Sequence, residues 1–217
     1  MASSDLIADL AKNTELLGTE GAANLKEFFD ATDTRTSTAD LLKLATVFGK
    51  LGEDGVENIR GLTLAANKLN IILGDDLSAG ADEVTRTIAK VVKVLDADKE
   101  FGLEGALVRV GSAINEVTKS STASADSIVD FLGRVAGVGQ LGKISADELV
   151  ALGGTLDALT VSAEVSGTSF QRFFLQFGKA KNFEAFGKTL GISAEEFAEL
   201  LDTQGLFKTF TDVIEAA

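Results

Sequence analysis

Apolar residues recur at helical spacing along almost the whole chain. One stripe consists of four leucines that follow one another at steps of three, four and three residues: Leu149, Leu152, Leu156 and Leu159. Such steps place side chains on one face of a helix. Similar stripes run through four other segments: 41–51, 56–73, 84–95 and 128–138. Because no segment sustains the period-two alternation that is typical of half-buried strands, the pattern predicts an all-α protein without a sheet.

Glycine and short polar residues divide these stripes. The chain holds 22 glycines and no proline. Four glycines directly follow a leucine at the end of a stripe, where a left-handed backbone favours glycine: Gly52, Gly74, Gly142 and Gly191. Residues that favour helix N-termini precede the next stripes: Thr38, Ser78, Ser124, Ser145 and Ser193. These signals predict short helices joined by glycine-containing turns, near residues 4–17, 20–31, 38–51, 54–73, 79–95, 102–118, 124–140, 145–159, 163–179, 182–190, 193–202 and 204–216.

Two of the predicted helix starts carry a fuller signature. Ser145 stands three residues before Glu148, and Ser193 stands three residues before Glu196, each just ahead of an apolar run. In this capping box the serine hydroxyl accepts from a free N–H of the first turn, and the glutamate accepts from the serine N–H. The glutamate also lies near the positive end of the helix dipole. Both serines are therefore predicted N-caps.

Two segments of the chain share the same order of predicted elements, which bears on how the helices are arranged. Residues 38–73 and 145–177 each predict a capped helix, a turn and a second apolar helix. Either a weak internal repeat or the shared sequence rules of capped helices explains this likeness. A repeat favours stacked helical hairpins over one closed bundle. Glycines interrupt the heptads before they run for three or four turns, so we expect a segmented, compact array rather than a long coiled coil.

Charge and the missing residue types restrict function. Asp and Glu outnumber Lys and Arg by 33 to 20, which gives a formal net charge of −13. Such a surface repels phosphate backbones and anionic lipid heads, so direct nucleic-acid binding is disfavoured. The absence of Cys and His excludes Ser-His-Asp triads, thiol nucleophiles and His-Glu-x-x-His zinc sites. No apolar run approaches the roughly 18 residues of a membrane span, and the N-terminus lacks the order of a signal peptide.

A glycine-rich segment resembles a phosphate-binding loop. Gly137, Gly142 and Lys143 have the required spacing. The next residue is Ile144, which offers no hydroxyl to magnesium, and a predicted helix stands where the motif needs a strand. We therefore expect a helix-helix connection and no nucleotide cofactor.

The run 96–100 spaces three carboxylates like the start of a calcium-binding loop. Phe101 occupies the sixth position, where the loop needs glycine, and Leu107 occupies the twelfth, where glutamate belongs. Three further carboxylates stand in the first turns of a predicted helix, where the helix dipole favours them: Glu195, Glu196 and Glu199. We expect no catalytic, cofactor-binding or metal-binding residue in this chain.

Phenylalanines cluster between residues 170 and 186. Four of them fall on one face of a predicted helix: Phe170, Phe173, Phe174 and Phe177. They are interpreted either as core packing or as an exposed patch that binds a partner. Four cations give this part of an acidic chain a positive local balance: Arg172, Lys179, Lys181 and Lys188. The candidate partner surface consists of Phe170, Arg172, Phe173, Phe174 and Phe177.

The order of motifs in the second half resembles the core region of phage tail tape measure proteins. The resemblance rests on a capped helix at 143–159, a Gly-Thr-x-Phe-x-Arg-Phe helix at 167–173, and a Phe-x4-Gly-Ile-Ser-x-Glu-Glu-Phe unit at 186–197. It is closest over 107–217, looser over 38–106, and slight over residues 1–37. It divides the chain into an N-terminal helical half, 1–106, and a half similar to the tape measure core, 107–217.

This resemblance implies a structural, non-enzymatic component of a phage or prophage tail, with roles in tail length determination, tail assembly and genome delivery. It implies partners among tail tube and tail assembly proteins, with self-association as a further partnership, and a location inside the tail tube after synthesis in the bacterial host cytoplasm. The chain also lacks Pro, Trp and Tyr. That bias suits a repetitive helical protein, and it also suits the alternative of a stand-alone or engineered helical binding module without enzymatic activity.

Overall fold

The computed structural model describes residues 3–14, 18–74 and 77–217. These residues form α-helices and one short 3₁₀-helix and contain no strand, so the predicted all-α class is confirmed. The elements are α1 (Ser3–Lys12), α2 (Gly18–Asp30), α3 (Thr38–Lys50), α4 (Val56–Leu73), α5 (Ala81–Val94), α6 (Ala97–Ser120), α7 (Ala125–Leu141), α8 (Ala146–Ala158), α9 (Ala163–Phe177), η2 (Ala180–Asn182), α10 (Phe183–Leu190), α11 (Ala194–Gln204) and α12 (Leu206–Ala216). Within the same residues, no helix has both the length and the apolar character needed to cross a membrane.

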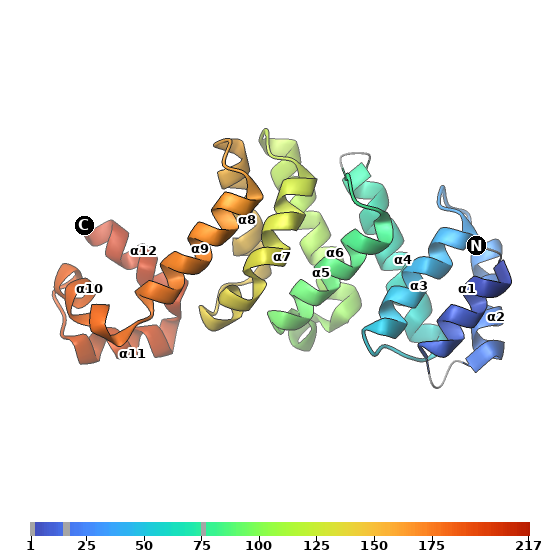
Figure 1. Ribbon diagram of the computed structural model, residues 1–217, viewed down its shortest axis with the longest axis horizontal. Coiled ribbons are helices and arrows are strands. Elements are labelled where there is room, and N and C mark those ends of the chain that lie inside the picture. The colour runs from blue at the N-terminus through green and yellow to red at the C-terminus, as the bar shows by residue number, and fades with distance from the viewer. Residues whose placement is uncertain (1–2, 15–17, 75–76) are drawn as a thin grey trace.

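The helices form two layers along an elongated array (Figure 1). One layer contains α1, α3, α5, α7 and α9, each packed on the next, and the other contains α2, α4, α6 and α8 in series. Consecutive helices of the two layers pair as hairpins, and the hairpins stack side by side. At one end of the array, α10, α11 and α12 form a separate C-terminal unit around the end of α9 (Figure 1). The structure thus has the array of short helices and helical hairpins that the sequence predicts.

The two segments with a similar order of features occupy different places in this arrangement. Residues 38–73 become α3 and α4, and residues 145–177 become α8 and α9. The first helix of the earlier pair lies in the odd layer, whereas the first helix of the later pair lies in the even layer. The pairs are not equivalent positions of a repeat. Their likeness reflects the common sequence rules of capped helices.

Most predicted helix starts agree with the structure, and two are corrected. The capping boxes of Ser145 with Glu148 and of Ser193 with Glu196 are both present. The cap of α3 is Ser37 instead of Thr38, because the Ser37 hydroxyl accepts from Asp40 N at 3.2 Å.

Ser78 does not cap α5, because its hydroxyl donates to Asp126 Oδ2 at 2.5 Å. Gly80 takes the N-cap position of α5 without a side-chain bond. Tertiary contacts thus override the local signal at this helix start.

The predicted helix boundaries need correction at three further places. Three of the four glycines have the expected positive φ: Gly52, Gly74 and Gly191. Gly142 does not, since its φ is −83°, and the following Lys143 adopts the left-handed conformation with φ 55°. The helix predicted to begin at residue 102 begins at Ala97 and is interrupted at Gly102, where φ is 68°. α1 ends at Lys12, earlier than predicted, and residues 15–17 of its predicted range lie outside the described residues.

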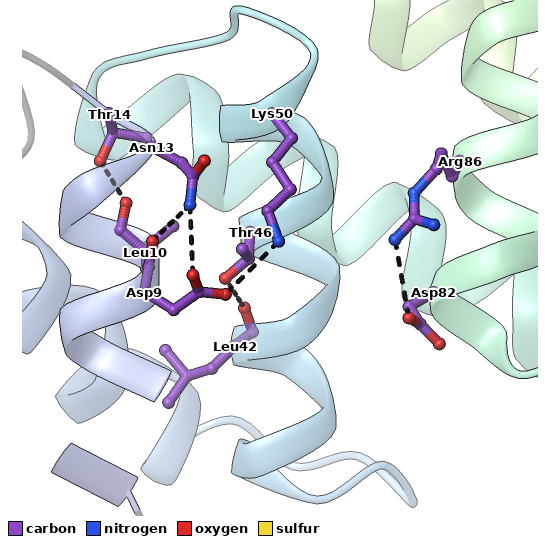
Figure 2. Close-up of polar contacts among 9 residues, drawn as sticks. All are labelled: Asp9, Leu10, Asn13, Thr14, Leu42, Thr46, Lys50, Asp82 and Arg86. Carbon is purple, nitrogen blue, oxygen red and sulfur yellow. Dashed lines mark hydrogen bonds and ion pairs between the residues drawn. The ribbon is translucent and has the colours of Figure 1, made fainter. Parts of the chain in front are cut away.

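Two buried threonine hydroxyls are satisfied by main-chain groups of the same turn of the chain. Thr14 and Thr46 are buried, and each hydroxyl donates to the carbonyl oxygen four residues earlier at 2.8 Å (Figure 2). Between α1 and α3, Lys50 Nζ and Asp9 Oδ2 lie 3.5 Å apart (Figure 2). Exposed ion pairs of this kind contribute about 0 to 1 kcal/mol. Apolar packing between α1 and α3 therefore contributes most to their contact.

One hydrophobic core continues through the array from Leu6 in α1 to Phe174 in α9. A second, small core contains Phe177, Phe197 and Val213. Two side chains of α12 pack against both cores: Leu206 and Phe210. The sequence-based division between residues 106 and 107 falls inside α6, where Leu107 is fully buried. The division therefore describes only where the resemblance is closest. It is not a structural boundary, because the larger core contains residues from both sides of it.

Candidate partner surface

α9 carries the candidate partner surface, and the structure divides its five residues. Phe170, Phe174 and Phe177 are buried, with exposed fractions of 9%, 3% and 1%. Phe173 is 40% exposed, and Arg172 is exposed as well. No ion pair among the described residues involves Arg172. A partner that approaches α9 therefore meets Phe173 and Arg172, while the other three rings serve packing. The role of the five residues in partner binding remains a prediction.

The buried rings connect α9 to helices on both sides of it. The Phe170 ring lies 5.8 Å from the Phe131 ring of α7, edge to face. Toward the C-terminus, the Phe177 ring lies 5.7 Å from the Phe197 ring of α11, and the Phe174 ring lies 5.7 Å from the Phe210 ring of α12. Aromatic pairs at such distances add about 0.5 to 1.5 kcal/mol beyond their area burial. α9 thus belongs to both cores and joins them.

The segment that resembles a phosphate-binding loop is a docking point for the C-terminal unit. Leu206 N donates to the carbonyl oxygen of Gly142 at 3.0 Å, and Lys143 Nζ donates to the carbonyl oxygen of Asp202. Gly205 is close to this turn, since a Cβ added there would lie 2.9 Å from Lys143 Cβ. The lysine that would contact phosphate in such a loop is thus used to hold α11 and α12 on the turn between α7 and α8.

The run that resembles a calcium-binding loop is the start of α6. Lys99 Nζ lies 2.7 Å from Asp96 Oδ1, and its hydrogen bond lowers the pKa of the Asp96 carboxyl. Among the described residues, no three acidic side chains are grouped so that they could hold a metal ion. Asp96 occupies the N-cap position of α6 without a side-chain cap bond, and residues 97–100 form the first turn of that helix.

One exposed surface was missed by sequence reasoning. The leucine stripe of α8 indicated a core face, but only Leu149 is fully buried, and Leu159 is 66% exposed. The reason is tertiary, because α8 is the last helix of the even layer that the described residues form. A signal was present in the sequence, since Asp157 is the only charged residue between 149 and 163.

The fold is an all-α array of stacked helical hairpins with a small C-terminal helical unit. The model of the phage-related minor tail protein family matches residues 31–217, so the chain belongs to that family. Membership implies a component of the phage tail with partners in tail assembly. No curated protein and no solved structure matches the chain.

Proposed function

We propose that this chain is a core segment of a tape measure protein, acting in tail assembly, tail length determination and genome delivery. The observation that carries the proposal is that each motif shared with tape measure proteins forms a defined helix or turn of the structure. The capped helix becomes α8, the Gly-Thr-x-Phe-x-Arg-Phe segment lies within α9, and Gly191 with Ser193 forms the turn between α10 and α11. Membership in a tail protein family supports the same proposal.

The compact fold favours assembly and delivery over simple measurement of length. A fully helical chain of 217 residues would extend about 330 Å at 1.5 Å per residue. Here the helices are short and folded back on one another in two layers (Figure 1), so each residue contributes much less to the length. In the proposed role, this segment offers surfaces to tail tube and tail assembly proteins inside the tube, following synthesis in the host cytoplasm.

The proposed role is structural and non-enzymatic, without direct nucleic-acid contact by this segment. The net charge of −13 opposes contact with a phosphate backbone. The segment's contribution is mechanical support and partner binding through exposed side chains such as Phe173 and Arg172.

An in-frame deletion of codons 38–217 in the encoding phage tests this function. We expect few assembled tails, or tails that fail to deliver the genome, measured by electron micrographs, plaque counts and release of DNA into cells. Supplying the intact gene in trans is the control and should restore all three. Infectious particles with tails shortened by about 1.5 Å per deleted residue would instead show that the segment only measures tail length.

The alternative function is that of a stand-alone or engineered helical binding module. The observation that favours it is the exposed, nearly uncharged face of α8. Under this alternative, the same deletion leaves tail length and infectivity unchanged. The deletion experiment therefore separates the two functions.

A further inference from the structure

The C-terminal unit is attached to the array at few points. Its helices α10, α11 and α12 pack mainly on one another, around the small core of Phe177, Phe197 and Val213. Outside the connecting segment 178–182, two hydrogen bonds join the described residues of this unit to the array. Both end in the turn between α7 and α8, on Gly142 and on Lys143. The polar attachment of the unit is therefore concentrated on one turn.

This turn supplies partners for two main-chain groups at the break between α11 and α12. Leu206 follows Asp202 by four residues, so in an unbroken helix its N–H would donate to the carbonyl oxygen of Asp202. Gly205, with φ 85°, ends that helix. The N–H of Leu206 donates instead to the carbonyl oxygen of Gly142 at 3.0 Å. The carbonyl oxygen of Asp202 accepts from Lys143 Nζ. The α7–α8 turn thus satisfies both groups that the break leaves open.

Lys143 holds a backbone conformation that glycine adopts with less strain. It follows α7 in the left-handed region, with φ 55°. Its N–H donates to the carbonyl oxygen of Gln140 at 3.1 Å, and the N–H of Ile144 donates to the carbonyl oxygen of Gly139 at 2.8 Å. These two bonds define a Schellman helix end, in which the left-handed position usually holds glycine. The lysine therefore costs the array some stability at this position.

The same pair of bonds ends α3, α8 and α10, which allows a comparison. At the left-handed position α3 has Gly52 and α10 has Gly191, as the motif favours. α8 has Thr160 there, with φ 63°, and the Thr160 side chain is exposed and makes no hydrogen bond with the described residues. Lys143 combines the strained backbone with a side-chain contact to another unit. A strained residue with such a contact points to a use for the strain.

We propose that Gly142 and Lys143 form a latch, and that the C-terminal unit moves away from the array as one body when the latch opens. Phe177, at the end of α9, is the pivot, because it belongs to the small core that stays intact. Opening separates the Phe210 ring from the Phe174 ring, which lie 5.7 Å apart in the closed form. The open form exposes more of the candidate partner surface. The proposal does not depend on the tape measure role, since it concerns contacts within this chain.

Amide hydrogen exchange of the intact chain, resolved by NMR, tests the movement. The N–H of Leu206 reports the latch, because its acceptor Gly142 lies in the array. The N–H of Val213, inside α12, reports unfolding of the unit itself. In the wild type we expect the Leu206 amide to be less protected than the Val213 amide, because local opening precedes unfolding. Equal protection of the two amides would show that the unit leaves the array only by unfolding, and would overturn the proposal.

Lys143→Met removes the ammonium group and keeps the aliphatic stem and the strained backbone. We expect the protection of the Leu206 amide to fall about fivefold, as for the loss of one hydrogen bond, while that of Val213 is unchanged. The result is diagnostic because Lys143 contacts α11, whereas Leu206 begins α12. Unchanged protection of Leu206 would overturn the latch. An equal fall at Val213 would overturn movement as one body.

Matched glycine variants test the strain. Lys143→Gly loses the same hydrogen bond as Lys143→Met and relieves the left-handed backbone, so its urea midpoint should be the higher of the two. Thr160→Gly makes the same backbone change at the end of α8. It should raise the urea midpoint above that of the wild type and leave the protection of Leu206 unchanged. A midpoint of Lys143→Gly no higher than that of Lys143→Met would contradict a strained latch. A fall in Leu206 protection in Thr160→Gly would show general loosening instead of a latch.

Discussion

The main-chain N–H of Leu206 donates to the carbonyl oxygen of Gly142 at 3.0 Å, which joins the first residue of α12 to the turn between α7 and α8. The two residues belong to different units of the molecule. Lys143 reinforces the contact through the carbonyl oxygen of Asp202. The C-terminal unit is therefore fixed to the array at a second point besides α9.

Gly205→Ala should weaken this attachment. Gly205 has φ 85°, and a Cβ there would lie 2.9 Å from Lys143 Cβ and 3.0 Å from the Gly142 carbonyl oxygen. We expect a loss of about 1 to 3 kcal/mol in the free energy of unfolding, measured by urea denaturation. Gly137→Ala is the control, because Gly137 lies in α7 with open space around it. It should stabilise the protein by about 0.5 to 1 kcal/mol.

Phe174→Ala should cost more stability than Phe173→Ala. Phe174 is 3% exposed and Phe173 is 40% exposed, although both rings contact Phe210. Truncation of a buried Phe costs about 3 to 5 kcal/mol, and we expect the first variant in that range and the second below it. Chemical denaturation of both variants gives the comparison. Equal losses would show that Phe173 is part of the core and would remove it from the candidate partner surface.

Gly154→Ala should destabilise the joint between α6 and α8. The added methyl group would lie 2.2 Å from Val117 Cγ1, so one of the helices or side chains must shift. Overpacking of this kind costs about 1 to 3 kcal/mol. Val117→Ala in the same chain should recover part of the loss, since it removes the opposing methyl groups. A thermodynamic double-mutant cycle measures this recovery, and strictly additive effects would contradict a direct contact.

Acid should remove a contribution that Asp40 makes to stability. Hydrogen bonds from Lys43 and then from Ser37 lower the pKa of the Asp40 carboxyl below its ordinary value of 3.8. A carboxyl whose pKa is lower in the folded state stabilises the fold above the unfolded value, and the contribution is lost as the pH falls through the folded value. Asp40→Asn should therefore lower Tm at pH 7 and match the wild type only once the pH falls below the lowered pKa of the folded state.

Asp33→Asn, at an exposed residue, serves as the control for this charge removal. Because the chain has no histidine, the Tm of the wild type should change little between about pH 5 and 8. A difference between Asp40→Asn and the wild type that persists in acid would point to the loss of a cap contact instead of the loss of a charge.

Local signals predicted the helices well because their causes lie within a few residues. Ser145 and Ser193 cap their helices through contacts with residues three positions later, and such contacts are visible in the sequence. Ser78 failed as a cap because Asp126, distant in the chain, binds it. Leu159 looked like a core residue because the stripe does not reveal that α8 is the last helix of its layer.

The candidate partner surface shows the same limit. Helical spacing placed Phe170, Phe173, Phe174 and Phe177 on one face, which is where the structure has them. It did not distinguish Phe173 from the others, because the exposure of that ring depends on how far α12 extends over α9. No local sequence pattern predicts the contact between Leu206 and Gly142, because the two residues are distant in the chain.

The two-layer order of the helices also determines how the molecule responds to force. Because each helix packs mainly on those one or two positions away in the chain, contacts are short in sequence separation, and folding can begin at several hairpins and spread. Tension applied at the two chain ends would therefore peel the array one hairpin at a time. A chain drawn through a narrow channel would therefore unfold in a series of small steps. Each hairpin could then refold beyond the channel independently of the others.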